Sequence, residues 1–550
     1  MGCSTARLHL SACLAATLLA ACSGGGGSDG SNLAATPAPA PAPAPAPSGP
    51  TFTAGVFESA DQFESQCETP RSGVDIEGNA FPDQQGATID ETFWLRSWTH
   101  ETYLWNDEVV DRDPTPFTDR LEYFALLKTT EQTPSGEDKD DFHFSEPTED
   151  FVAARNSAPN AGYGFQLIVA SNTPPRDYRI LYTEPGSPAA ELEAGEPKFK
   201  RGTRILSIDG VDLIAGDTQS DINTLNAGLF PENSGETHTF EVLDVDGDVR
   251  TVSVVSDDIV EQPVNRTQLI DTPSGKVGYI LFNTFSPFSS EEQIANAISL
   301  LKSDGVTDLV LDLRYNGGGL LAVASQLAYM VAGDAQTSGK TFELLQFNDD
   351  AGSQNPVTGE FNEPVPFIDT GLGFSLVNGA PLDSLDLTRL FILSTENTCS
   401  ASEAVINGLR GIDVEIILIG DVTCGKPYGF YPTDNCGETY YTIQFRGLNE
   451  KGFGDYSDGF VPAESSFAFG ERVSGCVVAD DLSHELGDTD EALLAAALTY
   501  RDTGACPPAP ATTSSSQIAR TSAPGLELRT NARSPTEDIL RQNRDMRTPY

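Results

Sequence analysis

Basic residues are scarce in this sequence. Its 550 residues hold 33 lysines and arginines against 81 aspartates and glutamates, which gives a formal net charge of −48 at pH 7. Because so acidic a surface repels the phosphates of DNA and RNA, the composition argues against a nucleic-acid-binding role. The charge favours solubility in a salty medium, and the alternative is a preference for cationic substrates.

Motifs for metals and nucleotides are also missing. The cysteines include no CxxC pair, the spacing typical of zinc sites. The aspartates of residues 244–248 depart from EF-hand spacing and alternate with valines, which favours a hairpin turn. Residues 420–426 have the GxxxxGK shape of a phosphate-binding loop, but Pro427 stands where magnesium binding needs Ser or Thr. We therefore expect no metal and no cofactor, and we reject an NTPase.

The N-terminal apolar run is too short for a good membrane span. Arg7 and His9 precede an alanine-rich stretch over residues 10–21, as in an export signal. The stretch ends in Leu-Ala-Ala-Cys at Cys22, which resembles the bacterial lipobox, whose cysteine is lipidated. Ser23 follows in place of an aspartate that would signal inner-membrane retention. The resemblance implies a lipid-anchored protein of the bacterial cell envelope, in the outer membrane and facing the periplasm or the cell surface. The alternative is an ordinary secretory signal.

Composition and periodicity divide the chain into six segments. They are a lipoprotein signal peptide (1–21), a Gly/Ser/Ala-Pro linker (22–50), an N-terminal helical region (51–160), a β-rich domain (161–258), a core (259–506) and a disordered tail (507–550). The aromatic residues of the helical region are expected in its hydrophobic core.

The core alternates strands with helices. Continuous apolar runs predict strands over residues 277–282, 309–313, 390–393 and 415–419. Helices are expected between them, beginning at Ser289 with a capping box to Glu292 and closing at Gly305, then over 320–331 and 402–409. This alternation predicts a parallel or mixed sheet covered on both faces, so the fold class is α/β and multidomain.

Polar segments follow three of these strands, at residues 314–319, 398–403 and 423–426. In such sheets ligands bind beyond the carboxyl ends of the strands, so the three segments are expected to converge. A serine at position 400 would begin a helix, where free backbone N–H groups and the helix dipole favour a developing oxyanion.

A serine hydroxyl needs a base to become a good nucleophile. None of the five histidines lies near these segments in sequence; they are His9, His100, His143, His238 and His484. Lys426 lies one strand away from Ser400. Buried at the sheet edge, its ammonium would lose hydration and its pKa would fall toward neutrality, which makes Lys426 the candidate base.

Together the three blocks resemble the C-terminal processing (tail-specific) serine peptidases. The blocks are Leu-Asp-Leu-Arg-Tyr-Asn-Gly-Gly-Gly (311–319), Ser-Ala-Ser-Glu (400–403) and Gly-Lys (425–426), and the resemblance covers roughly residues 85–505. It implies Ser400 as nucleophile, Lys426 as general base, and an oxyanion hole made by the backbone N–H groups of Gly318 and Ala401. The implied activity is a serine endopeptidase that cleaves protein or peptide substrates through a Ser–Lys dyad and an acyl-enzyme.

The chain departs from the family in two respects, and the first is a separation between Ser400 and Lys426 that is one residue longer than usual. Members often carry a glutamine four residues after the lysine, where this sequence has Phe430. Gln444, on a later strand, is the candidate substitute, and no third catalytic member is assigned. The alternative function is a non-catalytic peptide- or ligand-binding lipoprotein on the same fold. The expected partners are substrates, and a membrane through the lipid anchor alone; the sequence does not predict the oligomeric state.

The β-rich domain resembles a PDZ domain. The resemblance begins at a loop that in PDZ domains holds a peptide's C-terminal carboxylate, here Gly162, Tyr163, Gly164 and Phe165. Glycines suit this loop because they let a carboxylate approach backbone N–H groups. A turn at 185–190 and a strand at 204–208 follow in the matching order. Recognition of substrate C-termini is implied, and the alternative is a β domain without a ligand.

Six cysteines remain after Cys22: Cys67, Cys399, Cys424, Cys436, Cys476 and Cys506. An even count in an oxidising compartment predicts three disulfides, from fifteen possible pairings, and the alternative is free buried cysteines. Cys399 and Cys424 lie at adjacent strand ends of the proposed fold, so we expect them to pair. Cys67 and Cys506 bracket the folded region and are also expected to pair, which leaves Cys436 with Cys476.

Overall fold

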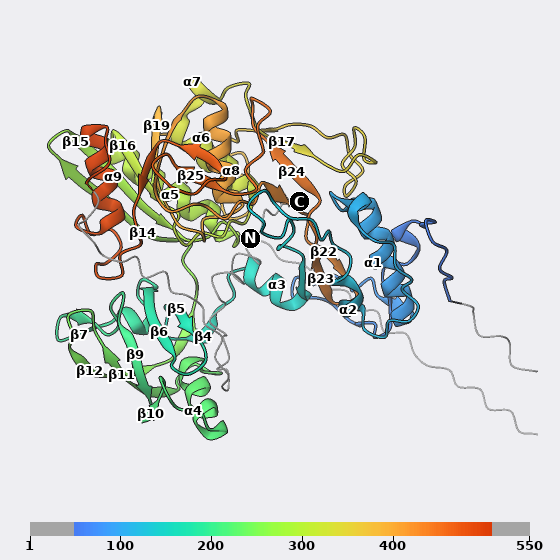
Figure 1. The fold of residues 1–550 in the computed structure, drawn as a ribbon, viewed down its shortest axis with the longest axis horizontal. Coiled ribbons are helices and arrows are strands. Elements are labelled where there is room, and N and C mark those ends of the chain that lie inside the picture. Colours follow the sequence, from blue (N-terminus) through green and yellow to red (C-terminus); the bar gives the residue numbers. More distant parts are fainter. Residues whose placement is uncertain (1–48, 509–550) are drawn as a thin grey trace, which may run out of the picture. The chain divides into compact units, whose positions relative to one another are not determined.

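The computed structural model describes residues 49–508 (Figure 1). The signal peptide, Cys22, most of the linker and nearly all of the tail lie outside the described residues. Within residues 49–508, no helix is both long enough and apolar enough to cross a membrane.

The N-terminal region is built from short elements around an aromatic core. Its helices are η1 (Ala60–Gln62), α1 (Thr88–Thr102), η2 (Asn106–Glu108), α2 (Arg120–Phe124) and α3 (Thr148–Arg155), and its strands are β1 (Gln66–Cys67), β2 (Gln84–Gln85) and β3 (Phe144–Pro147). Trp94 and Trp98 of α1 are buried against Phe124 and Tyr440. Tyr440 comes from a segment that is distant in the sequence. The prediction that these aromatics form a core is confirmed.

Residues 160–259 form a second body, drawn in green in Figure 1. Its sheet has the order β12-β11-β9-β6-β5, with β10 paired to β9. The elements are β4 (Asn160–Gly162), β5 (Phe165–Ser171), β6 (Asp177–Thr183), η3 (Pro188–Ala190), β7 (Leu192–Glu193), β8 (Glu196–Pro197), β9 (Arg204–Ile208), β10 (Val211–Asp212), α4 (Gln219–Leu229), β11 (Thr237–Leu243), β12 (Val249–Val255) and β13 (Asp257–Ile259). Strands β4 and β13 pair where the chain enters and leaves this body. Residues 244–248 form the hairpin turn between β11 and β12, as predicted.

A six-stranded mixed sheet forms the core, in the order β14-β15-β16-β19-β20-β27. Its strands are β14 (Val264–Thr272), β15 (Gly275–Phe282), β16 (Asp308–Asp312), β19 (Arg389–Ser394), β20 (Glu415–Gly420) and β27 (Gly475–Val477). Within this sheet, β15, β16, β19, β20 and β27 run parallel to one another, and β14 pairs antiparallel to β15. All four apolar runs chosen from the sequence are strands of this sheet.

Helices cover both faces of the sheet. Helices α5 (Ser289–Asp304), α6 (Leu321–Ala332) and α8 (Ala401–Gly411) pack on one face, with Ile280 and Leu311 in their cluster. Helix α9 (Ala492–Thr503) packs on the other, with the neighbouring residues Tyr279 and Val310. Successive side chains of a strand point to opposite faces, so strands buried on both sides need continuous apolar runs. This layering confirms the predicted α/β class.

Smaller sheets surround this core. Their strands are β17 (Thr341–Gln346), β18 (Val365–Pro366), β21 (Tyr428–Gly429), β22 (Thr433–Asn435), β23 (Glu438–Tyr441), β24 (Phe445–Leu448), β25 (Phe460–Pro462) and β26 (Glu471–Val473), and the short helix α7 (Asp334–Thr337) precedes β17. Strand β3 of the N-terminal region pairs antiparallel with β23, from Phe144 opposite Tyr441 to Pro147 opposite Glu438. The N-terminal region is thus joined by a strand pair to the segment that follows Lys426.

One helix begins differently from the prediction. The N-cap of α5 is Phe288, and no side chain caps the first turn. The hydroxyl of Ser289 instead hydrogen-bonds that of Ser157 over 2.9 Å. The predicted capping box between Ser289 and Glu292 is therefore wrong, because a tertiary contact takes the hydroxyl. The helix closes as predicted at Gly305, which has φ +70°.

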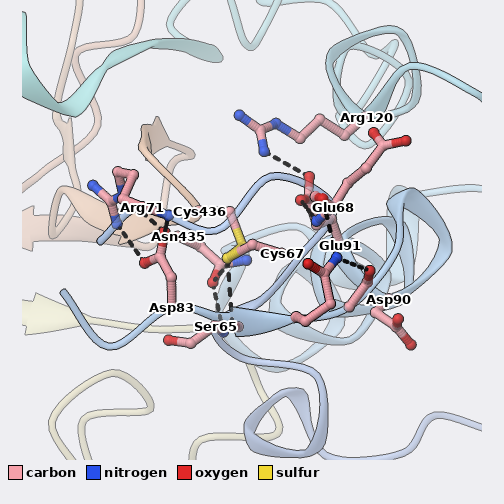
Figure 2. Close-up of a disulfide and its surroundings, with 12 residues drawn as sticks. Ser65, Cys67, Glu68, Arg71, Asp83, Asp90, Glu91, Arg120, Asn435 and Cys436 are labelled. Carbon is pink, nitrogen blue, oxygen red and sulfur yellow. Dashed lines mark hydrogen bonds and ion pairs between the residues drawn. A yellow bond between two sulfur atoms is a disulfide. The ribbon is translucent and has the colours of Figure 1, made fainter. Parts of the chain in front are cut away.

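The three disulfides correct two predicted pairs. Cys399 pairs with Cys424 as predicted, but Cys67 pairs with Cys436 and Cys476 with Cys506. Figure 2 shows the Cys67–Cys436 bridge beside Ser65, whose backbone N–H donates to Asn435 over 2.8 Å. The pairs Cys67–Cys506 and Cys436–Cys476 were wrong because the N-terminal segment packs on the β22–β23 hairpin, whereas Cys506 follows α9 beside β27.

Candidate active site

Three loops meet at the carboxyl ends of β16, β19 and β20. The backbone N–H of Cys399 and the hydroxyl of Ser402 both donate to the carbonyl of Asn316, over 3.0 and 3.1 Å. The N–H of Cys424 donates to the carbonyl of Thr398 over 3.1 Å. The predicted convergence of these segments is therefore confirmed.

Ser400 is the N-cap residue of α8. Its backbone has φ +55° and ψ −110°, a region that residues other than glycine rarely adopt. Backbone strain of this kind concentrates at functional sites. The serine also lies where the helix dipole favours negative charge. Both features suit a nucleophile whose attack creates an oxyanion.

A buried carboxylate joins the loop that carries Ser400 to the loop that carries Lys426. Oε2 of Glu403 accepts the backbone N–H groups of Ser400 and Lys426, over 3.0 and 2.8 Å. Its Oε1 accepts the N–H of Gly425 over 2.9 Å and the hydroxyl of Thr423 over 2.5 Å. Burial raises the pKa of Glu403, and the hydrogen bonds it accepts oppose that rise.

Sequence reasoning gave Glu403 no role. Its position three residues after Ser400, at the start of a helix, is a capping-box spacing from which their mutual contact could have been predicted. The contacts to residues 423–426 carried no sequence signal, because they depend on β19 and β20 being neighbours.

Lys426 is fully buried, and its ammonium lies against two aromatic rings. Nζ is 4.4 Å from the ring centroid of Phe142 and 4.7 Å from that of Phe430. Phe430 follows on the same loop, whereas Phe142 belongs to the N-terminal region. The predicted burial of Lys426 at the sheet edge is confirmed.

Gln444 does not take the place of a glutamine beside the lysine. Its Oε1 accepts the backbone N–H of Tyr431 over 2.7 Å, and its Nε2 donates to the hydroxyl of Thr102 over 3.5 Å. Gln444 therefore fixes local backbone, and the suggestion that it holds Lys426 was wrong.

The two backbone N–H groups expected in an oxyanion hole differ in their hydrogen bonding. The N–H of Gly318 donates to Oδ1 of Asn316 over 2.9 Å. Ala401 is the first residue of α8, a position whose N–H has no acceptor within its own helix. Gly318 has φ +114°, which explains a glycine at this position.

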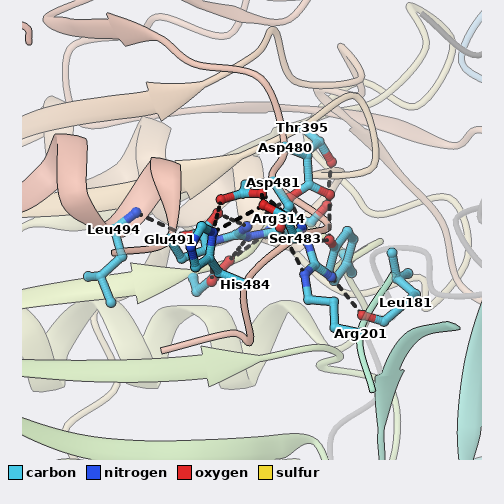
Figure 3. A network of polar contacts seen from close by, with 12 residues as sticks. Leu181, Arg201, Arg314, Thr395, Asp480, Asp481, Ser483, His484, Glu491 and Leu494 are labelled. Carbon is cyan, nitrogen blue, oxygen red and sulfur yellow. Dashed lines mark hydrogen bonds and ion pairs between the residues drawn. The ribbon is translucent and has the colours of Figure 1, made fainter. Parts of the chain in front are cut away.

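Buried charges fix the loop after β16. The guanidinium of Arg314 is fully buried between Asp312 and Glu491, with distances of 2.9 Å to each, and also contacts Asp480 (Figure 3). Asp480 in turn accepts the hydroxyl of Tyr315 over 2.5 Å. This network fixes the position of the residues that directly precede Asn316 and the three glycines after it.

Arg201 connects residues 160–259 to the same network. Its guanidinium donates to the hydroxyl of Tyr315 over 2.6 Å and to Asp480 over 2.8 Å. Its backbone N–H donates to Glu485 over 3.0 Å. These contacts lie next to the loop that carries Gly318.

The four histidines within residues 49–508 make their contacts elsewhere. His143 donates from Nε2 to the carbonyl of Phe124 over 2.9 Å, and burial lowers its pKa. His100 stacks on Phe57, and His238 and His484 pair with aspartates. None is placed to serve as the base for Ser400.

The loop expected to bind a carboxylate precedes the edge strand β5. Gly164 has φ +77°, and a Cβ on it would lie 2.2 Å from Cβ of Ser187, so only glycine fits. Tyr163 is buried and donates its hydroxyl to the carbonyl of Gly228, whereas Gly162 and Phe165 are partly buried. Tyr163 is thus a core residue of this body.

Comparison with known proteins finds a family match over the residues that include Ser400 and Lys426. Residues 276–430 match the sequence pattern of peptidase family S41. A "Carboxyl-terminal-processing protease" of a Picosynechococcus species is 34% identical over 178 residues, which are 30% of this chain and 37% of the relative. A "C-terminal processing peptidase, chloroplastic" of Tetradesmus obliquus is 24% identical over 364 residues, 62% of this chain and 65% of the relative. The chain thus matches less than two thirds of the length of either relative.

A crystal structure supports the fold. An S41-type protein from Bacteroides fragilis superposes with a TM-score of 0.55 at 24% identity, covering 74% of this chain and 97% of that one. The chain therefore shares the fold of that structure, and its residues 276–430 are similar to the domain of peptidase family S41.

Proposed function

We propose that the protein is a serine peptidase in which Ser400 is the nucleophile and Lys426 the general base. The observation that carries the proposal is the tie between their loops, through the carboxylate of Glu403 and the Cys399–Cys424 disulfide. The match of residues 276–430 to a peptidase family supports it.

In the proposed reaction, neutral Lys426 accepts the hydroxyl proton of Ser400 as Oγ bonds to the substrate's carbonyl carbon. The carbonyl oxygen becomes an oxyanion and accepts the N–H groups of Ala401 and Gly318. Lys426 then passes the proton to the amine nitrogen as the C–N bond breaks, which leaves an acyl-enzyme. Water, deprotonated by Lys426, hydrolyses the ester and restores the serine.

Two rearrangements must accompany this reaction. The N–H of Gly318 is bonded to Asn316, so that bond has to open before the amide can meet the oxyanion. Ser400 and Lys426 are both fully buried, so a peptide reaches them only after neighbouring segments move. We therefore infer that the described conformation is a closed one.

The substrates are proposed to be proteins or peptides held by their C-termini. Residues 161–258 would act as a PDZ-like domain, and the strand β5, at the edge of its sheet, offers a place for an added peptide strand. The glycine loop before β5 supports binding of the terminal carboxylate. Amidation of a peptide's C-terminus should weaken its binding, and equal affinity for acid and amide would remove this role.

We also propose that the protein is exported and anchored by a lipid on Cys22. The support is the signal-like sequence before that residue, together with three disulfides in the described residues, which fit an oxidising compartment.

A fluorophosphonate probe tests the chemistry. The full chain should be labelled at Ser400 and should cleave peptides, whereas Ser400→Ala and Lys426→Ala should each lower cleavage by a thousandfold or more on the scale of triad removals, roughly 10³–10⁶. Activity should rise with pH as Lys426 loses its proton. Near-normal cleavage by Lys426→Ala would sink the dyad. Peptide binding without labelling or cleavage would favour a non-catalytic binding protein.

A further inference from the structure

We propose that Phe142 and Phe430 are positioning residues that hold the Lys426 ammonium against two aromatic faces. The proposal rests on the proposed function, since it concerns how the base of that dyad is placed. It also assigns the N-terminal region a direct part in the site, because Phe142 comes from that region.

The geometry is that of a cation over two π-faces. Nζ of Lys426 lies 4.4 Å from the ring centroid of Phe142 and 4.7 Å from that of Phe430. Both distances fall within the roughly 6 Å over which an aromatic quadrupole attracts a cation. A lysine side chain has a flexible four-carbon stem, so two faces restrict where its nitrogen can lie.

Both rings pack against the same hydrophobic cluster. Phe430 is 1% exposed and packs edge-on against Tyr441 at 5.1 Å, and Tyr441 stacks on Phe144 at 4.2 Å. The backbone N–H of Phe142 donates to Oδ1 of Asp140 over 3.0 Å. Phe142 is partly buried and packs against the hydrophobic cluster that contains Phe430 and Tyr441. Pairing of β3 with β23 connects the segments that carry the two rings.

The two rings affect the lysine in opposite ways. As apolar bodies they remove water from the ammonium, which favours the neutral amine. As π-faces they attract the ammonium, which favours the charged form. Leucine would keep most of the first effect and lose the second, so replacing either ring should lower the pKa of Lys426.

Other ionisable groups lie on the elements around Lys426. Glu403 of α8 accepts the lysine's backbone N–H. On the segment of Phe142, Asp140 accepts the hydroxyl of Tyr103, and His143 bonds Thr442 and Phe124. Near Phe430, the hydroxyl of Tyr441 donates to Glu146, and Tyr428 packs edge-on against Trp105. None of these groups is altered by exchanging Phe142 or Phe430 for leucine, so they form a constant background in the comparison.

The test compares pH profiles of kcat/KM for Phe142→Leu and Phe430→Leu with wild type. The acid limb should move to lower pH by about 0.5–1.5 units, the shift that loss of one cation–π contact produces. Phe142→Tyr keeps a π-face and should leave the limb in place. Phe361→Leu, at a side chain 64% exposed, is the matched control for the substitution itself. An unchanged limb in both leucine variants would overturn the proposal.

A second measurement separates this proposal from the proposed function. The chain has nine lysines, so protein labelled with ¹³C at lysine Cε gives few resonances, and Lys426→Arg assigns the one from Lys426. Its titration should show a lower pKa in the leucine variants whether or not the protein cleaves peptides. Equal pKa values of Lys426 in wild type and in the leucine variants would contradict the proposed role of the two rings, even if the protein is an active peptidase. A shifted pKa in a protein that never cleaves would support the placement and sink the peptidase.

Discussion

At the scale of single residues, Glu403 does most to define the candidate site. Two carboxylate oxygens accept four hydrogen bonds, from the loops that carry Ser400 and Lys426. A carboxylate can accept all four, whereas a primary amide would turn an N–H₂ group toward two donors. The carboxylate of Glu403, with acceptors on both oxygens, therefore holds together the two loops that carry Ser400 and Lys426.

Glu403→Gln should lower kcat by about 10–1,000-fold, because each lost contact displaces Ser400 or Lys426, the proposed nucleophile and base. The free energy of unfolding should fall by about 1–3 kcal/mol, as for a buried polar group left unpaired. Steady-state kinetics and urea unfolding measure the two effects. Glu396→Gln, an exposed residue on the same loop, is the control and should change neither. Unchanged kcat in Glu403→Gln would show that the loops hold their places without this carboxylate.

At the scale of elements, a buried glutamate, Glu184, directly follows β6. Glu184 is 3% exposed, and its Oε1 lacks a hydrogen-bond partner among the described residues. Its Oε2 accepts the N–H of Gln262, and its own N–H donates to the carbonyl of Gly164. Burial, with Glu261 nearby, raises its pKa to about 8.

This acid makes stability depend on pH. The folded state keeps the proton to about pH 8, whereas the unfolded chain releases it near 4.5. The contribution of Glu184 to stability is therefore fully present below pH 4.5 and is lost as the pH rises to about 8, with a slope of at most about 1.4 kcal/mol per pH unit. Unfolding of Glu184→Gln across pH 5–8 should lack this slope, and exposed Glu241→Gln should keep it. Parallel curves for wild type and Glu184→Gln would disprove the assignment.

At the scale of the whole molecule, the disulfides connect distant parts of the chain. Cys67–Cys436 joins residues 369 apart and ties the N-terminal region to the β22–β23 hairpin, whereas Cys476–Cys506 spans only 30. In the chain-entropy account, a bridge across a longer loop restricts the unfolded chain more.

The double variant Cys67→Ser/Cys436→Ser should therefore lose more stability than Cys476→Ser/Cys506→Ser, by about 2 kcal/mol. Denaturant unfolding of both under oxidising conditions makes the comparison, with peptide mapping to verify the remaining bridges. Equal losses would mean that native contacts, and not loop length, set the value of each bridge.

The sequence by itself determined the elements of the core and the place of its site. Continuous apolar runs have to be buried on both faces, so β15, β16, β19 and β20 could be predicted from residue type alone. Parallel strands bring their carboxyl ends to one edge, which placed Ser400 and Lys426 together and paired Cys399 with Cys424.

Only the tertiary structure decided which distant segments touch. The partners of Cys67 and Cys506 depend on where the N-terminal segment and α9 pack, and spacing in the chain does not contain that information. The same holds for Phe142, which lies 284 positions before Lys426 yet supplies a ring to its ammonium. Local patterns fix elements because burial acts residue by residue, whereas these contacts arise from the packing of whole elements, which local patterns do not encode.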